Sequence, residues 1–302
     1  MHSNTIRPGY GLFRPFWTLL AAAVFAISTG SALHAQSYTS FDPPGSVLTF
    51  GGGINEQGDI VGRWDDADGV SHGYLLRRGV YTTLDFPGAT FTAAIDINVF
   101  GAIVGRWENG DGNSKGFLFK NGRYTTIMYP GSIDTRCRGI DDFGRITGNF
   151  TFASDGLERG FFLDSRGYHE VFFPGTDSTD VWDINVLGVT IGDISDTSGI
   201  VSGYILRHGT FTKLDFPGAL DTTLRGINPQ GDFVGYYDMT DGSEHAILGT
   251  KDGMTSFDYP GASSTEAFRI NTRGEIVGDY FDADGNMHGY VRRPAPLHGG
   301  DH

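Results

Sequence analysis

Two positions of a repeated segment carry residues that could bind a ligand. We number positions from the Gly of a recurring Pro-Gly pair, which falls at Gly45, Gly88, Gly131, Gly175, Gly218 and Gly261. In the third to sixth copies, positions 5 and 7 include Arg136, Arg138, Asp180, Trp182, Arg225, Glu266 and Phe268. Charges of both signs beside aromatic faces suit a sugar or a small anionic ligand. In the alternative interpretation, the arginines and acids pair with one another and fill a central channel.

Acidic loops form a second candidate site. Two of them resemble the beginning of a calcium-binding loop, with Asp66, Asp68 and Gly69 in one and Asp282, Asp284 and Gly285 in the other. Calcium takes about six to eight oxygen ligands, and His72 and His288 stand near the place of the missing later carboxylate. Hairpin loops rich in Asp and Asn look the same without a metal. Structural calcium therefore stays an alternative to a metal-free loop, and the sequence predicts no other cofactor.

Other reactive residues fit structural roles. His72, His245 and His288 occupy equivalent places in their copies. Equivalent places lie far apart in a ring, so we interpret these histidines as structural residues, with zinc ligation as the alternative.

The lone cysteine, Cys137, stands where other copies have small or apolar residues, and we interpret it as a buried residue that fills space in the core. No G-x-S-x-G elbow and no phosphate-binding Gly loop occurs. Catalytic residues are therefore left unassigned.

An aromatic residue ends the second strand of most copies. The series is Trp64, Trp107, Phe150, Tyr237 and Tyr280. We interpret these rings as packing between neighbouring units, and a sugar-binding platform is the alternative.

The segment from Ala94 to Gly131 indicates which elements hold these positions. It contains four short strands, expected at 94–98, 102–107, 116–119 and 124–128. Asn98 and Gly101 bound a tight turn, and Asn121-Gly122 is a hairpin signal. No apolar period of 3.6 residues runs long enough for a helix. The sequence therefore predicts an all-β unit of four strands.

Six copies of this unit follow one another, with 43 or 44 residues between successive Pro-Gly pairs. Such a period indicates a repeat architecture. Radial stacking into a β-propeller is the usual way for four-stranded sheets to cover both faces, and an open solenoid is the alternative. We therefore predict a six-bladed β-propeller over residues 36–293.

The two ends of the repeat region favour closure. The last copy, 268–293, has three strands and lacks a fourth. The matching strand stands at the N-terminal end, where residues 38–45 closely resemble residues 81–88. We expect this N-terminal strand to complete the last blade, because the exchange removes the exposed sheet edge of a linear array.

The unit resembles the bacterial extracellular HAF repeat. The third strand opens with His-Gly-Tyr or His-Ala-Ile at His72, His245 and His288, after a Gly-Ile-Asn-x-x-Gly-x-Ile-Val-Gly motif and before the Pro-Gly pair. The resemblance covers about residues 38–293, and the departures are Lys115, Arg159 and Ser202 at the His position. It implies a secreted, propeller-like repeat protein, and it implies no established activity.

Residues 1–35 have the pattern of a secretory signal peptide. Arg7 and Arg14 precede an apolar run at 16–27, and small residues lead to the expected cut after Ala35. A cut after Ala32 and an uncleaved membrane anchor are the alternatives, although the run is short for a span. We expect an extracellular or periplasmic protein without stable membrane insertion after cleavage, and a disordered tail at 294–302.

The net charge of −14 disfavours nucleic acid and anionic membrane surfaces as partners. We therefore expect a monomeric, secreted binding module whose ligand is a glycan, a cell-envelope component or another protein. The alternative function is a carbohydrate-active hydrolase or lyase with its site at the channel mouth. A deep axial pocket with paired acids would favour the enzyme, and a plugged channel would favour binding.

Overall fold

The computed structural model describes residues 36–295, and the regular secondary structure of this part is entirely β-strand. The predicted signal peptide at 1–35 and residues 296–302 of the predicted tail lie outside the described residues. No helix of the described part has the length and apolarity that a membrane span requires. The prediction of an all-β fold is confirmed.

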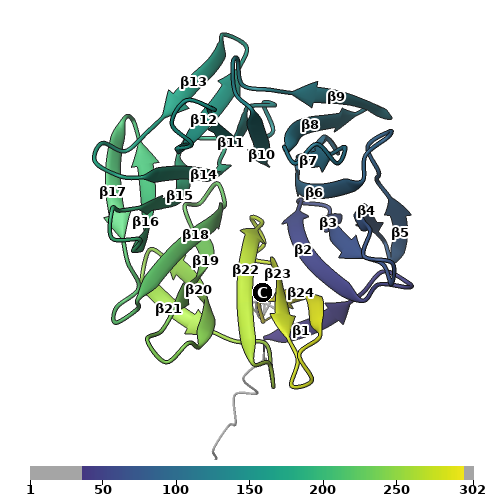
Figure 1. The fold of residues 1–302 in the computed structure, drawn as a ribbon. Helices are drawn as coiled ribbons and strands as arrows, with labels where there is room; N and C mark the ends of the chain where they lie inside the picture. Colours follow the sequence, from purple (N-terminus) through teal and green to yellow (C-terminus); the bar gives the residue numbers. More distant parts are fainter. Residues whose placement is uncertain (1–35, 296–302) are drawn as a thin grey trace, which may run out of the picture. The chain divides into compact units, whose positions relative to one another are not determined.

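The strands form two four-stranded and two eight-stranded sheets. Each eight-stranded sheet consists of two groups of four strands joined by a single parallel residue pair, Ser71 with Phe91 or Glu158 with Ser178. Every group of four is an antiparallel meander (Figure 1). Five groups use consecutive strands: β2 (Leu48–Ile54), β3 (Ile60–Asp65), β4 (Ser71–Arg77) and β5 (Val80–Thr83); β6 (Phe91–Ile97), β7 (Ile103–Glu108), β8 (Lys115–Lys120) and β9 (Arg123–Ile127); β10 (Asp134–Ile140), β11 (Ile146–Thr151), β12 (Glu158–Asp164) and β13 (Gly167–Val171); β14 (Ser178–Ile184), β15 (Thr190–Ser195), β16 (Val201–Arg207) and β17 (Thr210–Leu214); β18 (Asp221–Ile227), β19 (Phe233–Asp238), β20 (Glu244–Thr250) and β21 (Gly253–Phe257). The sixth group contains β22 (Ser264–Ile270), β23 (Ile276–Phe281), β24 (Met287–Arg293) and β1 (Ser37–Phe41).

The N-terminal strand β1 completes the sixth group, as predicted. It pairs antiparallel with β24, in a register that places Phe41 opposite Gly289. A Cβ atom at residue 289 would lie 2.3 Å from the Phe41 ring, so the glycine leaves the space that this ring occupies. The His288 ring N–H also donates a hydrogen bond to the carboxylate of Asp42, which directly follows β1.

A tight turn follows the first strand of each group and explains the recurrent Asn. In the second group, the Asn98 side-chain oxygen accepts hydrogen bonds from the backbone N–H groups of Phe100 and Ala102. Gly101 has a φ of 74°, a conformation that costs glycine little. The Asn98 amide is then free to donate to a neighbouring group.

These amides form a set of hydrogen bonds between groups that we call the Asn belt. In each bond, a side-chain amide donates to the backbone carbonyl of the equivalent residue in the next group: Asn55 to Asn98, Asn98 to Asp141, Asn185 to Asn228, Asn228 to Asn271, and Asn271 to Asn55. Asp141 has no amide to donate, and Arg145 donates to the Asn185 carbonyl instead. The last bond connects the sixth group to the first.

The hydrophobic core lies between adjacent groups. Val104 of the second group packs with Cys137 of the third, and Val61 of the first packs with Ala94 of the second. The same arrangement joins the end of the chain to its beginning, because Val277 belongs to a cluster with Ile54. Figure 1 shows the first strands β2, β6, β10, β14, β18 and β22 facing a common centre.

Every first strand carries a register irregularity near its end. In five groups the shift is a β-bulge at position 7, which is Ile95, Arg138, Trp182, Arg225 or Phe268. In the first group it covers Gly52 and Gly53. A bulge inserts an extra residue and breaks the alternation of side chains between the two faces. Positions 7 and 8 can therefore both face the centre.

Candidate functional site

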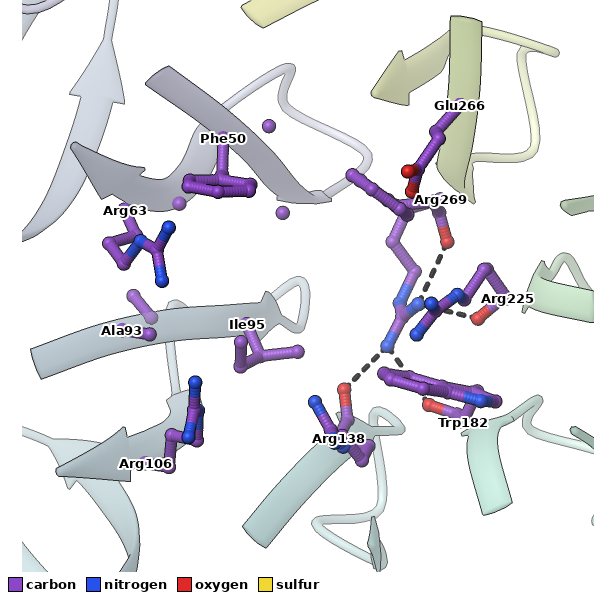
Figure 2. Close-up of a pocket in the computed structure, with 15 residues that line it drawn as sticks. Phe50, Arg63, Ala93, Ile95, Arg106, Arg138, Trp182, Arg225, Glu266 and Arg269 are labelled. Carbon is purple, nitrogen blue, oxygen red and sulfur yellow. Dashed lines mark hydrogen bonds between the residues drawn. The ribbon is translucent and has the colours of Figure 1, made fainter. Parts of the chain in front are cut away.

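A pocket of about 260 Å³, which we call the axial pocket, lies where the first strands converge. In the described part of the chain, its lining contains five arginines, Arg63, Arg106, Arg138, Arg225 and Arg269, but only one acid, Glu266. Its aromatic residues are Phe50, Trp182 and Phe268. Figure 2 shows the arginine side chains reaching this space from different strands. The pocket is thus basic, although the chain as a whole has a net charge of −14.

The structure gathers five of the seven residues predicted for the site. Arg138, Trp182, Arg225, Glu266 and Phe268 line the axial pocket. Arg136 and Asp180 do not, so their expected place in the lining is wrong. The bulge places the residue at position 7 toward the centre, and Arg138, Trp182, Arg225 and Phe268 all line the pocket. Position 5 reaches the pocket in three groups only, at Phe50, Ala93 and Glu266.

Arg136 has partners outside the axial pocket. It lies opposite Asn149 in the register of β10 and β11. Its guanidinium forms ion pairs with Asp134 at 3.0 Å and with Glu158 at 3.4 Å. These pairs hold the side chain within its own group and away from the pocket.

Trp182 is the central aromatic surface of the axial pocket. The guanidinium carbons of Arg138 and Arg225 lie 4.0 Å and 3.4 Å from the centroid of its ring. The indole N–H donates a hydrogen bond of 2.5 Å to the buried Asp193 carboxylate. Cation–π contacts of this kind are favourable, and more so when they are desolvated. The ring and both guanidinium groups are thus held in one arrangement.

Two further arginines were missed by the sequence analysis. Arg63 and Arg106 stand on second strands, directly opposite Phe50 and Ala93 at position 5. The Arg63 guanidinium carbon lies 3.6 Å from the Phe50 ring centroid. The sequence contains a pattern that could have identified them, since both arginines follow the Ile-Val-Gly sequence of the repeat. The equivalent residues in the third to sixth copies are Asn149, Asp193, Tyr236 and Asp279. The residue type at this place therefore varies among the copies, as it does at position 5.

Arg138 has no counter-charge in contact. Among residues 36–295, none forms an ion pair or a hydrogen bond with its guanidinium, and its Nε–H is buried without a partner. Burial lowers the pKa of Arg138 to about 9, and the charges of Arg106 and Arg225 act in the same direction against the attraction of Asp180. At neutral pH the group is still a cation. An anion entering the pocket would therefore supply the missing partner.

Acidic residues lie on the other side of the axial pocket. Burial raises the pKa of Glu266 to about 7, and the neighbouring Glu244 carboxyl adds to this rise while Arg225 opposes it. Burial also raises the pKa of Asp193 to about 6. Asp279, which is only 2 % exposed, likewise has its pKa raised by burial and by Glu266.

Beneath the pocket, position 8 closes the centre. This position alternates between glycine and a charged residue: Gly53, Asp96, Gly139, Asp183, Gly226 and Arg269. Arg269 donates hydrogen bonds to the carbonyls of Arg138, Trp182, Arg225 and Phe268 (Figure 2). Its Nε lies 3.4 Å from Asp96 and 3.7 Å from Asp183. We call Arg269, Asp96 and Asp183 the axial plug.

The axial plug separates two mouths. Arg269 lines both the axial pocket and a smaller pocket of about 80 Å³, which is formed by the turns of the Asn belt. Paired charges therefore lie in the centre, as the alternative interpretation of the sequence supposed. They belong to residues at position 8, which the sequence analysis did not consider, and not to the predicted residues at positions 5 and 7.

The acidic loops use their carboxylates locally. Asp66 accepts hydrogen bonds from the backbone N–H groups of Asp68 and Val70. Asp282 accepts them from Asp284 and Asn286, and hydrogen bonding by Asn286 lowers the pKa of Asp282 to about 2. Within residues 36–295, no group of three His, Cys, Asp or Glu side chains is placed to hold a metal ion.

We expect these loops not to bind calcium. Their carboxylates already accept backbone hydrogen bonds, which a cation would have to displace, and each loop offers few further oxygens. Calorimetric titration of chelator-treated protein with calcium should give no binding heat, and the melting temperature should stay unchanged. A rise in melting temperature that disappears in Asp282→Asn would contradict this expectation.

The histidines and the aromatic series have structural partners. His72 bonds to Asp85 and Asp66, and these hydrogen bonds raise its pKa although burial acts to lower it. His245 bonds to Asp258. The rings of Trp107, Phe150, Tyr237 and Tyr280 stack on Phe86, Tyr129, Phe216 and Tyr259 of the preceding groups. Both sets therefore fit the structural interpretation.

Cys137 is fully buried, and burial raises its pKa well above the ordinary range. A thiol in this state is neutral and inert. The interpretation as a packing residue is confirmed by its place in the core between the second and third groups.

Solved structures with a similar fold are β-propellers and include lectins. The putative TolB from Agrobacterium tumefaciens aligns with 87% of this chain and 100% of its own, at 15% identity and a TM-score of 0.56. AofleA from Arthrobotrys oligospora aligns with 85% of this chain and 86% of its own, at 13% identity and a TM-score of 0.55.

A variant of the Aleuria aurantia lectin, in complex with Fucalpha1-6GlcNAc, aligns with 89% of this chain and 99% of its own, at 9% identity and a TM-score of 0.50. That lectin is described as a six-bladed β-propeller. No family model matches the chain, and no curated protein matches it. At these identities the likeness concerns the fold, and β-propeller is the fold that it supports.

Proposed function

We propose that this chain is a secreted binding module, a closed six-bladed β-propeller of the HAF-repeat type, whose axial pocket binds an acidic glycan or a small anionic ligand. The observation that carries the proposal is the Arg138 guanidinium, which lies against Trp182 without a counter-charge. The pocket gathers four other arginines within an acidic protein. An anionic sugar could pair with the guanidinium groups and place its ring on the aromatic surface.

Three features support the closed, six-bladed form. The strand β1 pairs with β24, the Asn belt returns from Asn271 to Asn55, and the apolar cluster around Val277 includes Ile54. The signal-peptide pattern at 1–35 and the HAF resemblance support secretion to the periplasm or the cell exterior. The lectins among the similar structures are compatible with glycan binding.

A hydrolase or lyase is the second candidate function. It is favoured by Glu266, whose pKa of about 7 would suit a general acid. Most glycoside hydrolases, however, need a second carboxyl group on the opposite side of the scissile bond. Among residues 36–295, Glu266 is the only carboxyl group in the lining of the axial pocket, and the opposite wall carries arginines. We therefore favour binding.

The proposal predicts which substitutions weaken binding. Carboxylated or sulfated glycans on an array should bind the protein in preference to neutral ones. Arg138→Ala should then lower the affinity for the best glycan by about tenfold or more, because it removes a charge-assisted hydrogen bond from a desolvated site. Trp182→Ala and Arg225→Ala should have comparable effects. Isothermal titration calorimetry measures each loss.

Arg136→Ala is the matched control, since Arg136 lies two residues away on the same strand and outside the pocket. It should keep the wild-type affinity. Unchanged affinity in the three pocket variants, with binding abolished by substitutions in the Asp66 and Asp282 loops, would place the site on those loops and contradict the proposal.

A further inference from the structure

The surroundings of the axial pocket are divided by charge. Position 5 and the residue opposite it on the second strand form one cross-strand pair in each group. In the first three groups these pairs are Phe50 with Arg63, Ala93 with Arg106, and Arg136 with Asn149. In the last three they are Asp180 with Asp193, Thr223 with Tyr236, and Glu266 with Asp279. Among these pairs, the cations stand in the first three groups and the carboxyl groups in the last three.

The acidic half lacks counter-charges where it meets the pocket. Glu266 lines the pocket, and no residue of the described chain forms an ion pair with it. Behind it, the Asp279 Oδ2 atom is buried without a hydrogen-bond partner. The nearest cation on this side is Arg225, whose guanidinium donates to the Tyr236 hydroxyl. A buried carboxylate without a partner is costly, so this wall would gain from a cation.

The charged groups around Glu266 also favour the binding of a cation. Glu244 on β20, Asp238 on β19 and Asp279 on β23 surround it with negative charge, and Arg225 on β18 is the attractive partner. Like charges in one site hold the proton of a carboxyl group more tightly. A bound ammonium would instead favour the ionised form of Glu266.

We infer that the axial pocket takes a small amphoteric ligand, with its anionic group against Arg138 and a protonated amine against Glu266. This inference rests on the proposed function, since it assigns both ends of the ligand to the same pocket. The volume of about 260 Å³ lies at the lower limit of drug-sized pockets, which begin at about 300 Å³. One sugar ring with an amine and a carboxylate, or one amino acid, is the matching size.

Three related sugars can test the amine contact and the carboxylate contact separately. Muramic acid carries an amine and a carboxylate, N-acetylmuramic acid keeps only the carboxylate, and glucosamine keeps only the amine. Titration of the full chain near neutral pH should give an affinity for muramic acid about tenfold or more above that for either other sugar. Compared with N-acetylmuramic acid it adds a charge-assisted hydrogen bond to Glu266, and compared with glucosamine it adds one to Arg138.

Substitution of Glu266 assigns the amine contact. In Glu266→Gln the advantage of muramic acid over N-acetylmuramic acid should disappear, while binding of N-acetylmuramic acid persists or strengthens. This variant should fold, since it removes a negative charge from a cluster of like charges. Asp238→Asn, which removes a carboxylate of the same cluster from outside the pocket lining, is the matched control and should retain the preference. Arg138→Ala should weaken the binding of both carboxylated sugars.

The outcomes distinguish the two proposals. Equal affinities for muramic and N-acetylmuramic acid, both lowered by Arg138→Ala, would overturn the amphoteric ligand and leave the anion site standing. A preference for muramic acid that survives Glu266→Gln would overturn the assignment of the amine to Glu266. Failure of both carboxylated sugars to bind, together with an acidic-glycan array without signal, would overturn both proposals.

Discussion

Replacing Arg269 by methionine should destabilise the protein by about 3–5 kcal/mol at about pH 8. Arg269 is 5 % exposed, and its guanidinium is the cation between Asp96 and Asp183 in the axial plug. Methionine keeps much of the side-chain volume but leaves two buried carboxylates without a counter-charge. It also removes the donors to carbonyls of β10, β14, β18 and β22. Urea unfolding measures the loss.

The loss of folding stability in Arg269→Met should depend on pH. In the wild-type protein burial already raises the pKa of Asp183 to about 7, with Arg269 opposing the rise. Between the ordinary Asp range and about pH 7, the folded state therefore binds more protons at Asp183 than the unfolded state, and stability falls as the pH rises. Without Arg269 the pKa values of both aspartates should rise further. The variant should thus recover part of its stability near pH 5 and be weakest near pH 8.

Adding Asp96→Asn and Asp183→Asn to the variant is the control. Asparagine retains an oxygen that can accept the Ile140 or Ile227 backbone hydrogen bond now accepted by the aspartates. The triple variant should be more stable than Arg269→Met at about pH 8 and should lose the added pH dependence. A single substitution that costs the same at every pH would show that Arg269 acts by packing and hydrogen bonding alone.

Deleting residues 36–45 from the full chain should lower the melting temperature by more than about 10 °C. The deletion removes β1, which is the outermost strand of the sixth group and pairs along its whole length with β24. It also removes the Phe41 ring from an apolar cluster with Tyr74, a loss of about 3–5 kcal/mol by analogy with Phe→Ala substitutions. Scanning calorimetry compares the two chains.

The exposed edge of β24 gives a second readout. An unpaired strand is a template for association, so the deleted chain should aggregate or dimerise where the full chain does not. A synthetic peptide of residues 36–45, added in excess, should restore part of the melting temperature. Full thermal stability after the deletion would refute the role of β1 in closure.

The sequence indicates the architecture because the same constraints recur in every copy. The Asn or Asp at each turn, the Gly three residues later and the Pro-Gly pair are backbone requirements, and they predict strands within a few residues of β6 to β9. The exchange of β1 was also readable, because the residues near Tyr38 match those near Tyr81. Repetition thus converts weak local signals into a firm prediction of strands and turns.

The site was predicted less completely because strand alternation fails at the bulge. A period of two places positions 5 and 7 on one face, and this reasoning selected Arg136 and Asp180 together with Arg138 and Trp182. The bulge at position 7 sends positions 7 and 8 to the centre, whereas position 5 lines the pocket at Phe50, Ala93 and Glu266 but not at Arg136, Asp180 or Thr223. Glycine at position 8 in alternate copies was the available signal, since glycine within a strand often marks a bulge.

The axial plug also limits how this protein can change its number of units. A Cβ atom at Gly53 would lie 2.7 Å from the Asp96 backbone, and one at Gly226 would lie 2.8 Å from the Arg269 backbone. Each long side chain at position 8 therefore needs a glycine at position 8 of the preceding group, and the element that repeats along the chain is a pair of units. Inserting or removing a single unit would set two charged residues or two glycines next to each other. Duplication by pairs preserves the alternation, so a change in the number of units is accommodated most readily in steps of two.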